Sequence, residues 1–129
     1  MIQGNKQSRS LCSKNVKKRC EAIVMMVLSS DPATLREMNS SQLSRQFTQS
    51  SCHLRRTFRK HTGISLRAFI KQVKLLKSAF LLLTDETLTI RQVAKIFGFS
   101  SVDYFYLSFR QFFFVTPGKW RELWSEKRK

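Results

Sequence analysis

Two stretches of the chain repeat one pattern of hydrophobic and polar positions. Residues 41–61 and 90–112 each hold a short amphipathic helical segment, a few polar or small residues, and a second helical segment. Two helices joined by a short turn, occurring twice, predict two helix-turn-helix units. The second segments align at a fixed offset in three matched pairs, which are Leu54 with Phe105, Phe58 with Phe109, and Arg59 with Arg110.

The flanking regions are also predicted to be helical. An apolar stripe follows Val16 and should end before Pro32, because proline disfavours helix in the residue that precedes it. Residues 29–39 are then expected to be a connector. A longer helix is predicted over residues 66–83, where a 3.6-residue stripe is formed by Leu66, Phe69, Ile70, Val73, Leu76, Phe80 and Leu83.

Capping signals mark the ends of most of these segments. Asn39 or Ser40, Thr89, and Ser100 or Ser101 are plausible N-caps. Gly63 suits a left-handed C-terminal cap and Gly98 suits a turn. Thr116 and Pro117 predict the start of a last helix, because proline is preferred at the first helical position.

These elements predict an all-α chain. The run FFFVT at 112–116 has high strand propensity, but helix signals flank it and it has no partner strand. The expected organisation is a flexible basic arm at 1–15, a first helix-turn-helix subdomain at 16–65, a bridging helix at 66–84, a second helix-turn-helix subdomain at 85–125, and a basic tail at 126–129.

The charge indicates a polyanionic partner. The chain has 24 Lys and Arg against 8 Asp and Glu, a formal charge of +16 over 129 residues. Nucleic acid is the expected polyanion, because each neutralised phosphate releases counterions. A membrane is the competing partner, but the longest apolar runs, at 75–83 and 22–28, are far below the roughly 20 residues that span a bilayer. No secretory signal is present, so a cytoplasmic location at the bacterial nucleoid is expected.

The cysteines and histidines do not predict a metal site, a cofactor or an enzyme. Cys12, Cys20 and Cys52 form an odd set without CxxC spacing, so free thiols are expected. A basic ribonuclease is the enzymatic alternative, with His53 and His61 as acid and base. Eight residues on one helix would separate these histidines by about 12 Å along the axis, which disfavours joint action.

The stretch from about Val16 to Trp124 resembles the DNA-binding domain of the AraC/XylS transcription regulators. That resemblance implies two helix-turn-helix subdomains bridged by a long helix. The first half matches loosely, through Leu43, Leu54, Phe58, Gly63 and Phe69. The second half fits the family's I..VA...GF....YF...F...F..TP..WR pattern through Ile90, Val93, Ala94, Gly98, Phe99, Tyr104, Phe105, Phe109, Phe113, Thr116, Pro117 and Arg121.

The chain departs from the family pattern at several positions. Ser44 and Thr48 stand where the family usually has Ala and Gly. Phe114 stands where Gly is common, and a bulky residue there would be strained if the backbone needs positive φ. Leu107 replaces a residue that is often polar in the second recognition helix.

Carried over by position, the resemblance predicts which residues meet DNA. Base contacts are expected from Cys52, Arg55 and Arg56 in the first recognition helix and from Val102, Asp103, Tyr106 and Leu107 in the second. Arginine can bond O6 and N7 of guanine together, and the alternative is that both arginines touch only phosphate. Asp103 can accept from cytosine or cap its helix. Phosphate contacts are expected from Arg59, Lys60, Lys71, Lys74, Arg91, Lys95, Arg110, Lys119 and Arg121.

The leading function is therefore a sequence-specific transcription regulator, and the resemblance implies an activator. It would bind an asymmetric site on double-stranded DNA as a monomer, because two recognition helices on one chain need no palindrome. The alternative is an architectural DNA-binding protein without sequence preference. Leu76, Phe80 and Phe112 are apolar where the family is often polar, and packing in the core is favoured over a patch for RNA polymerase or a co-regulator.

Overall fold

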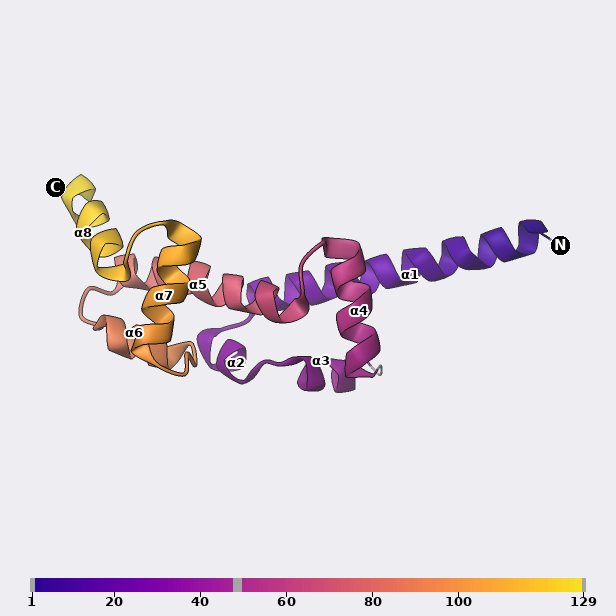
Figure 1. Ribbon diagram of the computed structural model, residues 1–129, viewed down its shortest axis with the longest axis horizontal. Helices are drawn as coiled ribbons and strands as arrows, with labels where there is room; N and C mark the ends of the chain where they lie inside the picture. Colours follow the sequence, from indigo (N-terminus) through magenta and orange to yellow (C-terminus); the bar gives the residue numbers. More distant parts are fainter. Residues whose placement is uncertain (1, 48–49, 129) are drawn as a thin grey trace. The chain divides into compact units, whose positions relative to one another are not determined.

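The computed structural model describes the backbone of residues 2–47 and 50–128 and the side chains of residues 16–47 and 50–125. Within these ranges the chain forms helices and no strand, so the predicted all-α class is confirmed (Figure 1). In chain order the helices are α1 (Ile2–Ser29), α2 (Pro32–Glu37), α3 (Ser40–Gln46), α4 (Ser51–Thr62), α5 (Leu66–Thr84), α6 (Ile90–Ile96), α7 (Val102–Phe113) and α8 (Pro117–Arg128).

The helices group into two compact units. The first contains the chain before Ser30 together with Asn39–Phe69, and so holds α1, α3 and α4. The second contains Ser30–Met38 together with the chain from Ile70 on, and so holds α2, most of α5, α6, α7 and α8. Each unit therefore contains one of the two predicted helix-turn-helix pairs.

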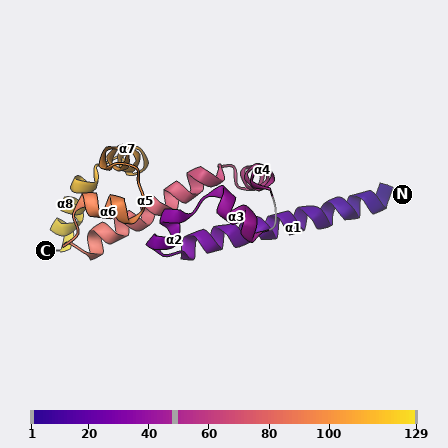
Figure 2. The same ribbon diagram turned by 90° about the horizontal axis from the view of Figure 1, so that it is seen from below.

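In the first unit, α4 packs on both α3 and α1. Figures 1 and 2 show α4 lying across the axis of α1, since the second view looks along α4 while α1 runs across the picture. The buried side chains include Leu54 and Phe58 of α4, and the Phe58 ring lies 5.6 Å from that of Phe69. Cys20 of α1 is buried, and its thiol donates to the Thr57 carbonyl at 3.9 Å.

Helix α1 begins earlier than the apolar stripe indicated. The stripe placed its start at Val16, whereas the helix begins at Ile2. Residues 2–15 contain no proline to stop a helix, and they include residues of good helix propensity such as Lys, Gln, Arg and Leu. Along the predicted stripe Ile23 and Val27 are buried, but Leu28 is exposed.

The second unit is held together by a row of aromatic rings. Phe105 and Phe109 of α7 are fully buried, with ring centroids 5.7 Å apart. Phe113 continues the row at 4.5 Å from Phe109 and at 5.1 Å from Trp120 of α8. The Trp120 indole then donates to the Ala79 carbonyl of α5 at 3.1 Å. This row joins α7 to α8, and the Trp120 hydrogen bond joins α8 to α5.

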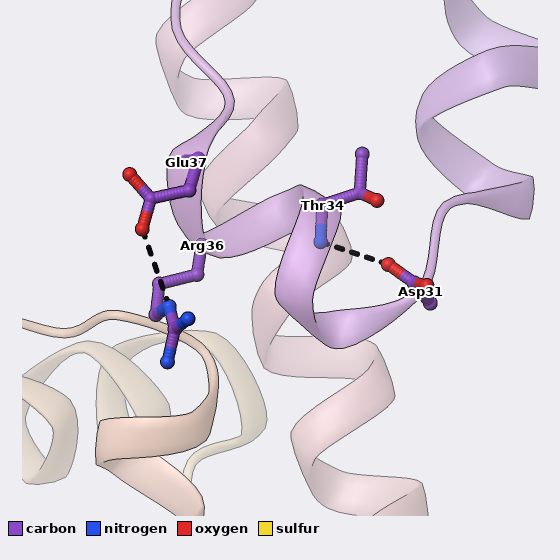
Figure 3. Close-up of polar contacts among 4 residues, drawn as sticks. All are labelled: Asp31, Thr34, Arg36 and Glu37. Atoms are coloured by element: carbon purple, nitrogen blue, oxygen red, sulfur yellow. Dashed lines mark hydrogen bonds and ion pairs between the residues drawn. The ribbon is translucent and has the colours of Figure 1, made fainter.

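The structure corrects the prediction of a connector over residues 29–39. Pro32–Glu37 forms α2, with Asp31 as N-cap and proline in the first turn. Asp31 accepts a hydrogen bond from the Thr34 N–H at 2.8 Å (Figure 3). Hydrogen bonding by Thr34 lowers the pKa of the Asp31 carboxyl. An aspartate followed by proline is a helix-start signal, but apolar periodicity does not reveal this short helix because only its Leu35 is buried.

Helix α5 follows its predicted range, but its apolar stripe does not hold to the end. Leu66, Ile70 and Val73 are buried as the stripe required. Leu76 and Phe80 are instead 46% and 71% exposed, which corrects the expectation that they pack in the core. From the middle of the helix onward the buried face is formed by Leu75, Ser78, Ala79 and Leu82. The helix therefore turns one face inward in its first half and another in its second half.

Candidate nucleic-acid interface

Local capping sets the start and end of α4. Ser50 accepts from the His53 N–H at 3.2 Å at the start of the helix. At the end Gly63 has φ of 83° and donates to the Arg59 carbonyl at 2.9 Å, as the sequence predicted. Asn39 at the start of α3 is also confirmed as an N-cap. These caps set the first residue of α3 and both ends of α4.

The outward face of α4 is strongly cationic. Leu54 and Phe58 are buried, so the residues on the opposite side of the helix are turned to solvent. Arg55 lies back along its own helix, since its Nε donates to the Ser51 carbonyl at 3.3 Å and one terminal nitrogen lies 3.5 Å from Cys52 Sγ. All five predicted contact residues of α4 are exposed, namely Cys52, Arg55, Arg56, Arg59 and Lys60.

Helix α7 is positioned by the same kind of signals. Thr89 forms a capping box with Gln92 at the start of α6, and Gly98 has φ of 76° in the turn that follows α6. Ser101 caps α7 by accepting from the Tyr104 N–H at 3.0 Å. Asp103 lies in the first turn, so the alternative that Asp103 itself is the N-cap is wrong.

The outward face of α7 differs in chemistry from that of α4. Phe105 and Phe109 bury one side of the helix. On the other side Asp103, Tyr106 and Leu107 are exposed, with Leu107 at 55%, while Val102 is half-buried. This face therefore offers one carboxylate, one phenol and aliphatic surface, and its cation is Arg110 near the end of the helix.

The predicted phosphate-contacting residues fall into two groups by burial. Lys71 and Lys74 of α5 are half-buried, whereas six others are exposed, namely Arg59, Lys60, Arg91, Lys95, Arg110 and Lys119. Lys71 Nζ lies 4.9 Å from the centroid of the Tyr104 ring. Burial lowers the pKa of Lys74, while the nearby Glu37 carboxylate and Tyr104 act in the opposite direction.

Arg121, predicted to contact phosphate, forms hydrogen bonds within the fold. Its Nε donates to the Leu82 carbonyl at 2.9 Å, and a terminal nitrogen donates to the Asp85 carbonyl at 3.2 Å. Those carbonyls lie at and just beyond the last turn of α5, where backbone acceptors lack helical partners. The guanidinium thus joins α8 to the end of α5, which is a structural role.

Comparison with known proteins places this geometry in a family. A helix-turn-helix domain family matches residues 43–123, more than half of the chain. The chain belongs to the AraC/XylS family.

Three relatives illustrate the match to the family. The transcriptional activator RhaR of Cronobacter sakazakii is 32% identical over 72 residues, 56% of this chain. The chain spans only 25% of the length of that activator. The C-terminal domain of the response regulator yesN from Fusobacterium nucleatum is 30% identical, with a TM-score of 0.65 over 83% of this chain and 98% of that one. The DNA-binding domain of AdpA, solved with a target DNA, shares the fold at 21% identity and a TM-score of 0.72, over 84% of this chain and 95% of that one.

Departures from the AraC/XylS pattern have structural outcomes. Phe114 adopts φ of 64° at the end of α7, the left-handed conformation that the usual glycine adopts without strain, and is 86% exposed. Ser44 is buried and satisfies its hydroxyl by donating to the Ser41 carbonyl at 2.7 Å. Thr48 lies outside the described residues. Phe112, like Leu76 and Phe80, is apolar where the family is often polar. It is half-buried, and its ring centroid lies 4.9 Å from that of Phe113.

Residues 16–47 and 50–125 hold no group of three His, Cys, Asp or Glu side chains placed to share a metal ion. Burial raises the pKa of the Cys20 thiol, with a smaller contribution from Glu21. In the same described stretch no helix is both long and apolar enough to cross a bilayer.

Proposed function

We propose that this protein is a sequence-specific DNA-binding transcription regulator that reads two adjacent major-groove segments with α4 and α7. The observation that carries this proposal is the outward face of α4, where four cations stand opposite the buried Leu54 and Phe58 in a chain of the AraC/XylS family. A helix-turn-helix presents such a face to base edges. RhaR is named as an activator, which favours activation as the output.

In the first unit, Arg55 and Arg56 are the proposed base readers. Both are exposed on α4, and the planar guanidinium bonds O6 and N7 of guanine together, a contact worth about 1–3 kcal/mol of discrimination. The hydrogen bonds of Arg55 to its own helix are long, so the side chain can extend to DNA at small cost. Cys52 lies one turn nearer the helix start and completes the reading face.

In the second unit, the proposed contacts are mostly apolar. Leu107 and the half-buried Val102 suit thymine methyl groups, and Tyr106 adds a phenol that can donate or accept. Asp103, which is not the helix cap, suits the cytosine N4 donor. We therefore expect α7 to read a T-containing segment and α4 to read a G-containing segment.

The remaining cations are proposed to hold the DNA backbone. They are Arg59, Lys60, Lys71, Lys74, Arg91, Lys95, Arg110 and Lys119, with Arg121 left out because its guanidinium binds the end of α5. Such contacts position the protein without specifying sequence. Two readers on one chain make a monomer on an asymmetric site the expected complex.

Leu76 and Phe80 are proposed to contact a protein partner. Their exposure leaves apolar surface on α5 that nothing in the described residues of the second unit buries. RNA polymerase or a co-regulator is the expected occupant for an activator.

Because DNA is the target, we place the protein at the bacterial nucleoid in the cytoplasm. The proposal includes no catalytic step.

A competition gel shift on a site selected from random DNA tests the reading role of α4. Arg55→Ala and Arg56→Ala are compared with Arg45→Ala, an exposed arginine at the end of α3 in the same unit. At least one α4 variant should lose about 5- to 150-fold affinity for the selected site and little for random DNA, the equivalent of about 1–3 kcal/mol. Equal losses on both DNAs, or sequence-independent binding by the unchanged protein, would instead establish an architectural DNA-binding protein.

A further inference from the structure

Helix α2 is part of the second unit although it is flanked in sequence by the first. Ser30–Met38 groups with the helices from α5 to α8, while the segments on both sides of it belong to the other unit. Leu35 is fully buried and Met38 is 92% buried, so both contribute to the core. Within the second unit α2 packs on α6, the first helix of the second helix-turn-helix.

The contact between α2 and the second helix-turn-helix centres on Gly98. This glycine forms the turn after α6 with φ of 76°. A Cβ atom placed on Gly98 would lie 2.5 Å from Arg36 Cγ and 3.2 Å from both the Cα atom and the carbonyl oxygen of Arg36. The turn therefore lies directly against the backbone of α2, and a glycine is required there for its conformation and for its lack of a side chain.

Helix α2 is itself attached to α5. Lys77 of α5 donates to the Ser30 carbonyl just before α2, and Glu37 lies close enough to Lys74 to raise the pKa of that lysine against the effect of burial. The Asp31 cap fixes the first turn of α2 (Figure 3). The hydrogen bond from Lys77 ties the start of α2 to α5, and the Gly98 turn packs against α2 as well.

What packs there is the segment that starts α7. Only three residues separate Gly98 from Val102, and Ser101 among them caps the helix. A helix of 12 residues is about 18 Å long, so a small change in the direction of its first turn displaces its far end by several times more. The fit of Gly98 against Arg36 therefore bears on the direction of the first turn of α7, while the aromatic row of Phe105, Phe109 and Phe113 holds the rest of the helix.

We propose that α2 positions the second recognition helix, α7. Arg36 is the positioning residue, and Gly98 is the residue of the turn that packs against it. The inference rests on the proposed function. It goes beyond that function because correct placement of α7 in the groove would depend on α2, which lies outside both helix-turn-helix pairs. Arg36 acts here through its backbone and the stem of its side chain. The Nε atom of its guanidinium is paired with the Glu37 carboxylate at 3.3 Å.

The test is footprinting of three variants on a DNA site selected with the unchanged protein. Gly98→Ala adds both backbone strain and the clash with Arg36. Gly63→Ala is the matched control, because Gly63 has φ of 83° but nothing within 4 Å of its added Cβ. The double variant Arg36→Ala with Gly98→Ala removes the Cγ atom responsible for the 2.5 Å contact.

Gly98→Ala should lose protection of the DNA segment read by α7, keep that read by α4, and bind the site roughly tenfold more weakly, as for one mismatched base pair. The Gly63→Ala control should keep the segment read by α4, the helix that Gly63 ends, because its backbone strain comes without a clash. The double variant should regain part of the protection of the α7 segment, because it removes the contact to Cγ but keeps the backbone strain and the 3.2 Å contacts to the Arg36 Cα atom and carbonyl oxygen. Protection of both segments by Gly98→Ala, or no recovery in the double variant, overturns the inference. If Gly98→Ala unfolds, as seen by circular dichroism, recovery in the double variant still decides. Failure of the proposed function is distinct, since the unchanged protein would then give no sequence-dependent footprint.

Discussion

Phe114 combines two features that cost stability. Its backbone has φ of 64°, a conformation that L-residues adopt at about 1–2 kcal/mol, and its ring is 86% exposed and so gains little from burial. Phe114→Gly should therefore raise the free energy of unfolding by about 1 kcal/mol, measured by urea denaturation. The reverse change, Gly63→Ala at φ of 83°, should lower it by a similar amount.

A decrease in stability for Phe114→Gly would show that the ring makes contacts worth more than the strain. Phe114 would then stabilise the fold by packing and would not be a strained C-cap. Binding of DNA by Phe114→Gly should be unchanged, because this residue follows the last turn of α7 and lies outside the proposed reading face.

Residues whose role is set by their neighbours in sequence could be predicted without the structure. The sequence predicts the cap at Thr89 and the left-handed Gly63, and it narrows two other caps to neighbouring pairs, of which the structure shows Asn39 and Ser101. Each of these signals depends on a few adjacent residues. The exposure of Phe80 could not be predicted. It depends on which helices cover α5, and the local stripe carries no information about them.

At the scale of elements, α8 and α5 meet through Arg121. Because its guanidinium satisfies two carbonyls near the end of α5, Arg121→Ala should lower the free energy of unfolding by about 2 kcal/mol. The salt dependence of DNA binding should stay the same. Arg110→Ala is the matched change, since Arg110 is exposed on α7 and should lower the slope of log K against log salt by about 0.9 with little loss of stability.

The opposite pattern would contradict this division of roles. If Arg121→Ala lowered the salt slope while stability stayed constant, the family-derived prediction of a phosphate contact would be right after all. Chemical denaturation and salt titration of the two variants together separate these outcomes.

The recognition helices were predicted well and α2 was not, for one physical reason. Helix α4 and helix α7 each bury two large residues four positions apart, Leu54 with Phe58 and Phe105 with Phe109, so their periodicity is visible in sequence. Helix α2 buries only Leu35 along its six residues and relies on Asp31 and on packing against α6. A helix stabilised by tertiary contacts leaves little pattern in its own residues.

At the scale of the whole molecule, the charge of +16 makes binding to any DNA favourable, so charge alone does not imply sequence specificity. The outward faces of α4 and α7 are expected to contribute unequally to sequence specificity. Helix α4 carries the arginines, while α7 carries Asp103, Tyr106 and Leu107. Specificity is therefore expected to depend mainly on a G-containing segment, with a T-containing segment adding to it.

Selection of bound sequences from a random DNA pool at physiological salt tests the central claim most directly. The account predicts one asymmetric motif in which a guanine-containing segment is the more strongly defined and a second segment lies one helical turn away, about 10 base pairs. Repeating the selection with Arg55→Ala and Arg56→Ala should weaken the guanine segment alone. Recovery of no motif, or of a motif that neither substitution changes, would contradict sequence reading by α4.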